Sequence, residues 1–273
     1  MDVYEASGPR LKYRPCGKPP MPEAVRVNGM MNSRNLTFDN TLEFQASGLP
    51  VWKRLLDVGM IVLLLPALLL VGTAVALVIK FGSRGPVLFR QERVGYRGRR
   101  FTCFKFRTMK VNAEVGSHRD HTEHLIKSQA PMVKLDAKSD PWLIPFGSIL
   151  RATGLDELPQ LINVLRGEMS IVGPRPCIAY EYEMYEPWQR RRFDAVPGLT
   201  GLWQVSGKNR TTFDEMIRFD IEYSKRVRLW LDAKIILKTF PALWTQCMDY
   251  RADKKESIRK RVSGSENSIN TEQ

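Results

Sequence analysis

The 273-residue chain is 43% hydrophobic and carries a net charge of +13, so it can bury one substantial core and suits an anionic partner. The charge alone allows three kinds of partner: nucleic acid, the anionic cytoplasmic leaflet of a membrane, or a phosphorylated substrate. Four cysteines, at positions 16, 103, 177 and 247, are too scattered for a CxxC metal or redox motif and indicate no disulfide framework.

The chain opens with an arm rich in proline. Residues 1–50 hold five prolines between positions 9 and 22 and lack a sustained apolar period. Such a composition buries too little apolar surface to offset the entropy of ordering, so we expect a disordered or loosely packed N-terminal arm. The first apolar run begins beyond residue 50 and is longer than the apolar region of a signal peptide, so we expect no cleaved signal peptide.

Residues 51–80 form the predicted membrane segment. The run Val58–Ile79 has no charged side chain and contains one proline, Pro66. A helix of this length could just cross a bilayer whose hydrocarbon is about 30 Å thick. However, Lys53 and Lys80 flank the run, and the positive-inside rule draws both flanks to the cytoplasm. Because Pro66 lacks an N–H and clashes with the preceding turn, we predict a re-entrant helix-break-helix; a kinked helix that crosses once is the alternative.

A basic and aromatic β-hairpin is predicted over Phe81–Met109. Two glycines near its middle separate two segments of mixed apolar and basic residues. Along the second strand, alternation places Lys105 and Arg107 on one face and Phe104 and Phe106 on the other. One face would then hold an anion while the aromatic face packs. The alternative is a solvated basic edge strand that resists aggregation.

Three histidines lie in the polar stretch of residues 110–140, at His118, His121 and His124. On a helix this spacing places them within one broad face, as a metal site would require. No cysteine lies close in sequence to complete a zinc site, so we favour an exposed, weakly structured insertion.

The segment Asp140–Pro176 contains the candidate chemistry. Residues 146–153 are predicted as a short helix stopped by Gly154, and Pro159 marks the first turn of a second helix that ends at Gly167. This arrangement places an acidic pair at a helix N-terminus.

The acidic pair is Asp156 and Glu157. At a helix N-terminus the backbone dipole and the free N–H groups favour ionised carboxylates. Such a pair can bind a divalent cation, or one carboxylate can act as a nucleophile while its neighbour orients the metal or the reacting group. Ordinary helix capping is the alternative. Arg151 upstream and Arg175 within GPRP favour the chemical reading, because rigidly held arginines bind phosphate.

The C-terminal part holds one loop and two helices by prediction. Residues 197–209, PGLTGLWQVSGKN, are predicted as a loop whose Trp203 closes over a nucleotide, lies in the headgroup layer or packs in the core. A capping box opens an amphipathic helix over residues 212–226. Residues 230–244 suit a helix on the membrane surface, or else a core helix with two snorkelling lysines. From Asp249 onward the charged and then Ser- and Asn-rich sequence predicts disorder.

The order of several motifs resembles the bacterial sugar transferases of the polyprenol-phosphate phosphoglycosyltransferase family, in particular its short, monotopic, exopolysaccharide-initiating members. The motifs are KRLLD, the proline-broken apolar run, GPVLFRQERVGYRGRRFTCFKFRTM, LDELPQLINVLRGEMSIVGPRP and PGLTGLWQVSGKNRTTFDEM, and they cover residues 51–245. The resemblance implies a mainly α fold with a small β-hairpin, a re-entrant membrane helix and surface amphipathic helices. It also implies a cytosolic catalytic domain over residues 81–248. The composition predicts the disordered tail, over residues 249–273.

Members of this family transfer a sugar 1-phosphate from a UDP-sugar to a polyprenyl phosphate, such as undecaprenyl phosphate, release UMP and use Mg²⁺. By resemblance, Asp156 attacks the β-phosphate of the donor, Glu157 assists, and both carboxylates serve the metal. The predicted substrate-binding residues are Lys105, Arg107, Arg151, Arg175 and Gln204. The implied partners are a galactose or glucose UDP-sugar, the lipid acceptor, membrane lipids and downstream glycosyltransferases, without nucleic acid, at the cytoplasmic face of the bacterial inner membrane.

Two positions depart from the family pattern. The helix break is Leu65-Pro66 where some members have Ser-Pro, and Asp140-Pro141-Trp142 stands where the family often has Asp-Pro-Arg. Two rival functions follow from the residues. A membrane-anchored basic adaptor that binds nucleic acid or anionic lipid would explain the charge but not an acidic pair among arginines. A UDP-sugar hydrolase would release UMP without a lipid acceptor.

Overall fold

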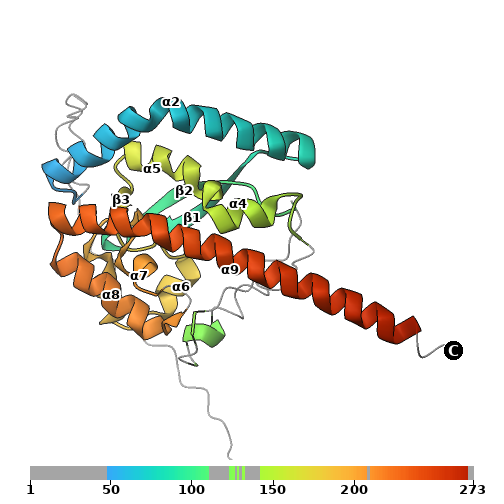
Figure 1. The fold of residues 1–273 in the computed structure, drawn as a ribbon. Coiled ribbons are helices and arrows are strands. Elements are labelled where there is room, and N and C mark those ends of the chain that lie inside the picture. Colours follow the sequence, from blue (N-terminus) through green and yellow to red (C-terminus); the bar gives the residue numbers. More distant parts are fainter. Residues whose placement is uncertain are drawn as a thin grey trace, which may run out of the picture. The chain divides into compact units, whose positions relative to one another are not determined.

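The computed structural model describes residues 48–110, 123–126, 128, 131–132, 142–207 and 210–269, which all belong to one compact unit, Asp39–Gln273. The predicted N-terminal arm up to residue 47, and His118 and His121, lie outside the described residues. Helices dominate the described part, with two separate two-stranded sheets (Figure 1). The α-helices are α2 (Val51–Gly82), α4 (Gly147–Thr153), α5 (Leu161–Leu165), α6 (Ala179–Met184), α7 (Leu202–Val205), α8 (Phe213–Lys225) and α9 (Leu229–Ile269). The 3₁₀ helices are η1 (Tyr96–Gly98), η3 (Leu155–Gln160) and η4 (Gln189–Asp194). The strands are β1 (Leu88–Val94), β2 (Arg100–Phe106), β3 (Ser170–Val172) and β4 (Gly198–Thr200).

Helix α2 is the one helix among the described residues that is long and apolar enough to cross a membrane. It runs for 32 residues as a single helix with Pro66 inside it, and Figure 1 shows it changing direction near its middle. A proline removes one hydrogen bond and crowds the preceding turn, which bends a helix without necessarily ending it. The predicted break is therefore a bend in one continuous element. Its apolar residues between Val62 and Val71 are largely exposed, with Leu63 78% and Leu70 74% exposed.

Both ends of α2 contact the rest of the fold. Near the N-terminal end, the Asp57 carboxylate accepts a hydrogen bond from the backbone N–H of Ile171 at 3.1 Å. After the C-terminal end, the Arg107 guanidinium donates to the carbonyl oxygens of Ser83 (3.0 Å) and Arg84 (2.9 Å). The apolar residues at each end are also buried, Ile61 among residues of β2 and α5, and Val75 and Ile79 among residues of β2 and α4.

A buried polar cluster fixes the first turn of α2 to α8 and α9. Lys53 is 2% exposed, forms an ion pair with Asp232 and donates to the hydroxyl oxygen of Tyr223 at 3.0 Å. The Tyr223 hydroxyl also lies 2.8 Å from the other carboxylate oxygen of Asp232. Lys53, which was predicted to flank the membrane segment, is therefore buried inside the protein and paired there with Asp232.

The predicted hairpin is confirmed. Strands β1 and β2 pair antiparallel from Leu88 opposite Phe106 to Val94 opposite Arg100. The connection passes through Gly98 at φ 75°, where a side chain would also meet the hydroxyl of Tyr182 at 2.9 Å. Glycine is required there for both reasons.

A second, parallel sheet was not predicted. Strand β3 pairs with β4 through Ser170 opposite Gly198 and Val172 opposite Thr200. Each strand has three residues, which is too short for an alternating pattern to be visible in sequence. The segment predicted as a loop at residues 197–209 therefore begins with a strand and continues as α7. Within it Trp203 is 6% exposed and donates to Thr211 Oγ1 at 2.6 Å, so the core-packing alternative is the correct one.

The C-terminal helices follow the sequence with one correction. The capping box is confirmed, since Thr212 and Glu215 exchange backbone-to-side-chain hydrogen bonds of 2.8 and 3.3 Å at the start of α8. Where the sequence predicted disorder from Asp249 onward, α9 continues to Ile269. The lysines, arginines and glutamates of this stretch are good helix formers, and their helical propensity extends α9.

Candidate active site

The acidic pair lies at the start of η3, directly after α4. Helix α4 ends at Gly154, whose φ of 73° only glycine adopts readily. The chain then turns at once, and the backbone N–H of Glu157 donates to the carbonyl of Gly154 at 3.1 Å. The predicted stop at Gly154 and acidic first turn with Pro159 behind it are confirmed, although the first turn is 3₁₀.

Two cations from different elements converge on Glu157. The Nζ atom of Lys105, in β2, lies 3.0 Å from Glu157 Oε1, and Nη1 of Arg175, which follows β3, lies 3.1 Å from the same oxygen. These side chains are between 16% and 35% exposed, so solvent screens the contacts only in part. The negative charge of Glu157 is the main cause that raises the pKa of Arg175. Glu157 is therefore held in place by two charge-assisted contacts.

Asp156 has different surroundings from its neighbour. It is 9% exposed, and burial, followed by the negative charge of Glu157, raises the pKa of its carboxyl group above the ordinary value of 3.8. The positive charges of Lys105, Arg175 and Arg151 act in the opposite direction. Within the described residues, no donor hydrogen-bonds its carboxylate. A carboxylate that is desolvated and not occupied by donors is suited to attack an electrophile.

Arg151 belongs to the last turn of α4, and its position is fixed from two sides. Its Nε donates to Thr108 Oγ1 at 2.9 Å. Its carbonyl and that of Ala152 accept hydrogen bonds from Nε2 of Gln246 in α9, both at 3.0 Å. The positive charge of Arg151 acts to lower the pKa of the Asp156 carboxyl group.

Two predicted binding residues lie elsewhere. Arg107 is 5% exposed and donates to the carbonyls of Ser83 and Arg84, which follow α2, so its guanidinium supports the C-terminal end of that helix. Gln204 in α7 donates from Nε2 to the carbonyl of Leu199 at 3.0 Å, and its buried Oε1 has no partner in the part of the chain described. A substrate contact by either residue stays a prediction.

Two arginines that the sequence did not single out support Arg175. Nη2 of Arg192 donates to the carbonyl of Arg175 at 2.8 Å, and Nη1 of Arg93 donates to the carbonyl of Pro176 at 3.2 Å. Burial lowers the pKa of Arg93, and the charge of Arg175 lowers it further. Arg192 stands in a run of three arginines, Arg190 to Arg192.

Arg192 is itself buried and paired. It forms an ion pair of 2.6 Å with Asp220 of α8, and each side chain is 2% exposed. Its Nη1 also donates to the hydroxyl of Tyr185 at 2.9 Å. Burial raises the pKa of Asp220 to about 6, against the opposing effect of Arg192. A chain of contacts thus runs from Asp220 through Arg192 and Arg175 to Glu157.

The chain is similar in sequence to a family of known proteins. The model of a family described as bacterial sugar transferase matches residues 49–246. The chain is 38% identical over 225 residues to the galactosyl transferase CpsE of Streptococcus agalactiae serotype III, covering 80% of this chain and 49% of that protein. It is 38% identical over 191 residues to the exopolysaccharide production protein ExoY of Sinorhizobium fredii, covering 70% and 84%. It is 41% identical over 204 residues to the UDP-glucose:undecaprenyl-phosphate glucose-1-phosphate transferase of Caulobacter vibrioides, covering 71% and 70%. The chain therefore spans about half of the first relative and most of the other two.

Proposed function

Because the chain belongs to the bacterial sugar transferase family, we propose that it moves galactose 1-phosphate or glucose 1-phosphate from a UDP-sugar to undecaprenyl phosphate, as the first membrane step of exopolysaccharide synthesis. The names of its relatives support both sugars and the lipid acceptor. Another relative, at 40% identity over 161 residues, is the undecaprenyl-phosphate galactose phosphotransferase of Salmonella typhimurium.

The observation that carries the proposal is the difference between two adjacent carboxylates. Glu157 is held through one oxygen by Lys105 and Arg175, whereas Asp156 is buried with its carboxylate unoccupied by donors within the described residues. This division suits a nucleophile beside a residue that orients it. A membrane-anchored basic adaptor binds without catalysis and would require neither a nucleophile nor a residue that orients it.

In the proposed first step, a carboxylate oxygen of Asp156 attacks the β-phosphorus of the UDP-sugar. An acyl phosphate that carries the sugar forms, and the bond from the β-phosphorus to the bridging oxygen breaks. The electron pair of that bond leaves with UMP. Lys105, Arg151 and Arg175 surround the pair with positive charge and offset the charge that develops on the leaving phosphate.

In the second step, a phosphate oxygen of undecaprenyl phosphate attacks the same phosphorus. The bond to Asp156 breaks, the carboxylate is regenerated, and the lipid carries the sugar through a diphosphate. Both substrates are anions, so a cationic site at the membrane surface lowers their repulsion. This gives the net charge of +13 a functional reason.

The two carboxylates of the candidate site fit Mg²⁺. Proteins commonly bind this ion through one or two carboxylates together with substrate phosphates, and Asp156 and Glu157 supply two adjacent carboxylates. Among the residues described, no cluster of three or more histidine, cysteine, aspartate or glutamate side chains could hold a metal alone. The phosphate oxygens of the UDP-sugar would complete the set of ligands around the ion. Bound there, the ion would neutralise charge on the diphosphate.

We further propose that α2 enters the cytoplasmic leaflet of the bacterial inner membrane and returns to the same side. Its two ends both contact the catalytic part, through Asp57 near the start and through Arg107 after the end, while the apolar middle is exposed. A helix that crossed the bilayer would separate its ends by about 30 Å of hydrocarbon, and one cytosolic domain could not hold both. The change of direction near the middle of α2, a helix that contains Pro66, supports this arrangement.

Helix α9 supports the same placement. Its residues Asp232 and Ile235 are buried, while large apolar side chains are exposed on its other side. Trp230, Leu237, Phe240 and Trp244 are each between 69% and 78% exposed. Exposed tryptophan and phenylalanine on a helix face are typical of helices that lie in the membrane interface.

One labelling experiment tests the function and the nucleophile. The purified full chain receives a UDP-sugar labelled in the β-phosphate, first without a lipid acceptor. We expect UMP release and covalent label on the peptide that contains Asp156, which undecaprenyl phosphate then discharges. Label on another residue would reject Asp156, and UMP release without lipid or covalent label would favour the hydrolase. A panel of UDP-sugars in the same assay identifies the sugar.

The topology is tested with single cysteines placed before Lys53 and after Lys80. We expect a membrane-impermeant thiol reagent to label both from the cytoplasmic side only. Labelling from opposite sides would show a spanning helix. Pro66→Leu restores the missing N–H, so we expect it to increase the spanning fraction.

A further inference from the structure

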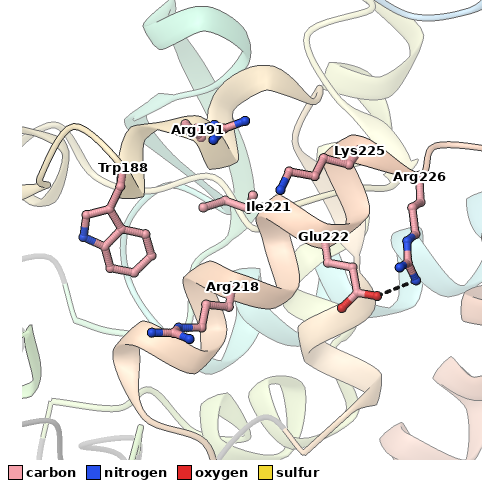
Figure 2. A pocket seen from close by; sticks show the side chains of 7 residues that line it. All are labelled: Trp188, Arg191, Arg218, Ile221, Glu222, Lys225 and Arg226. Carbon is pink, nitrogen blue, oxygen red and sulfur yellow. Dashed lines mark hydrogen bonds and ion pairs between the residues drawn. The ribbon is translucent and has the colours of Figure 1, made fainter.

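A cavity of about 440 Å³ lies between η4 and the outer face of α8. Figure 2 shows Trp188, Arg191, Arg218, Ile221 and Lys225 around it, together with the ion pair of Glu222 and Arg226. This volume falls within the range of cavities that hold small ligands. None of these residues belongs to the acidic pair or to the cations that surround it.

The charge of the cavity is strongly positive. Four of its seven lining residues are cations, and its one carboxylate, Glu222, is already paired with Arg226 at 2.8 Å. Arg191, Arg218 and Lys225 are exposed, and no carboxylate of the described residues forms an ion pair with them. Like charges gathered around one hollow repel one another unless an anion lies between them. The cavity therefore favours a ligand with several negative charges.

The cavity also offers a flat apolar surface. The guanidinium of Arg218 lies 6.0 Å from the ring centre of Trp188, and Ile221 lies between Trp188 and Lys225 in Figure 2. The indole of Trp188 is half-buried, and its accessible part and a planar guanidinium can both stack on aromatic rings. Inorganic phosphate would use the cations alone, whereas a ligand with an aromatic ring and phosphates would use the whole lining.

We propose that this cavity is a second, non-catalytic binding site for a free nucleotide, whose base stacks on Trp188 and whose phosphates contact Arg191, Arg218 and Lys225. The site is independent of the proposed reaction at Asp156. Behind it, the buried ion pair of Arg192 and Asp220 joins the same two elements, η4 and α8. A nucleotide bound across these elements would hold them together on the outside as the ion pair does on the inside.

The test is equilibrium dialysis of the full chain in lipid nanodiscs with labelled ATP, and with tripolyphosphate as the ring-free comparison. We expect one ATP site per chain, with ATP bound at least fivefold tighter than tripolyphosphate because the base adds stacking. Trp188→Leu should abolish that difference, and R218A/K225A should weaken ATP binding at least tenfold. R218A/K225A should keep the wild-type turnover of the UDP-sugar, which separates this site from the proposed function.

A matched control removes the same charge elsewhere. The double variant R97A/R100A loses two exposed arginines of the hairpin, and we expect it to bind ATP as the wild type does. The proposal is overturned if R218A/K225A binds ATP normally, or if R97A/R100A loses as much affinity. Equal binding of tripolyphosphate and ATP, unaffected by Trp188→Leu, would also overturn it, because the site would then recognise anions only. Thermal unfolding of each variant confirms that it is folded.

Discussion

Arg192 donates a hydrogen bond to the backbone carbonyl of Arg175 at 2.8 Å, and this contact lies between a buried ion pair and the candidate active site. Arg192 is fixed by Asp220 and Tyr185, and the side chain of Arg175 contacts Glu157. We infer that Arg192 is a positioning residue. It holds the loop after β3 so that Arg175 can reach the acidic pair.

Arg192→Lys keeps the charge, but an ammonium group cannot reproduce the three contacts that the planar guanidinium makes with Asp220, Tyr185 and the carbonyl of Arg175. We expect kcat per folded molecule to fall about 100-fold with little change in KM, because a displacement of about 1 Å at reacting groups can cost that much. Asp220→Asn leaves Arg192 buried without its counter-charge and should lower the free energy of unfolding by about 3 to 5 kcal/mol. Steady-state kinetics and denaturant unfolding in detergent measure the two effects. If Arg192→Lys lost only stability and kept kcat, Arg192 would be a packing residue.

The pH dependence of activity should reflect the raised pKa of Asp156. The nucleophile must be ionised, so kcat/KM should fall as pH decreases through a value above 3.8. For stability the sign is opposite. A carboxyl group whose pKa is higher in the folded chain binds its proton more tightly there, so protonation between 3.8 and the raised value stabilises the fold through this group.

Glu157→Gln isolates one cause of that shift. It removes the neighbouring negative charge and leaves Lys105 and Arg175 in place, so the pKa of Asp156 should decrease. We expect lower activity, because the orienting carboxylate is lost, and an acid limb of the pH profile that moves to lower pH. Lys105→Met should move the acid limb to higher pH, since it removes a charge that favours the ionised form. Shifts in the same direction for both variants would contradict this account.

Asn163 connects α5 to the hairpin through buried hydrogen bonds. Its Oδ1 accepts from the backbone N–H of Phe104 at 3.1 Å, and its Nδ2 donates to the carbonyl of Thr102 at 2.7 Å and to Glu168 at 2.6 Å. Asn163→Ala leaves these groups without partners and should lower the free energy of unfolding by about 3 kcal/mol. Denaturant unfolding measures the loss.

The matched control for Asn163→Ala is Arg100→Ala, which breaks an ion pair between two largely exposed side chains, Arg100 and Glu92. We expect that variant to lose less than about 1 kcal/mol. Equal losses in the two variants would show that the buried hydrogen bonds of Asn163 add no special stability.

Local signals in the sequence predicted much of the fold. Gly154 and the capping box at Thr212 marked helix ends correctly because each acts through its own neighbours in the chain. The acidic pair and Lys105 were identified in the same way. Arg192 was missed because its burial depends on Asp220 and Tyr185, which meet it only in the folded chain. Arg107 shows the converse. Alternation along the strand indicated its side, but not that the end of α2 would lie there.

The buried cluster at Lys53 determines which fragments of this protein can be made. If the chain is cut after Gly82 to obtain a water-soluble enzyme, Asp232 loses the ammonium group that neutralises it, and the Tyr223 hydroxyl loses a hydrogen-bond donor. The interior also loses Ile61 and Ile79, which are 4% and 1% exposed. An uncompensated buried charge alone costs about 3 to 5 kcal/mol, a large share of the stability of an ordinary domain. Helix α2 is therefore a structural part of the enzyme rather than a removable anchor, and biochemical work requires the intact chain in detergent or lipid.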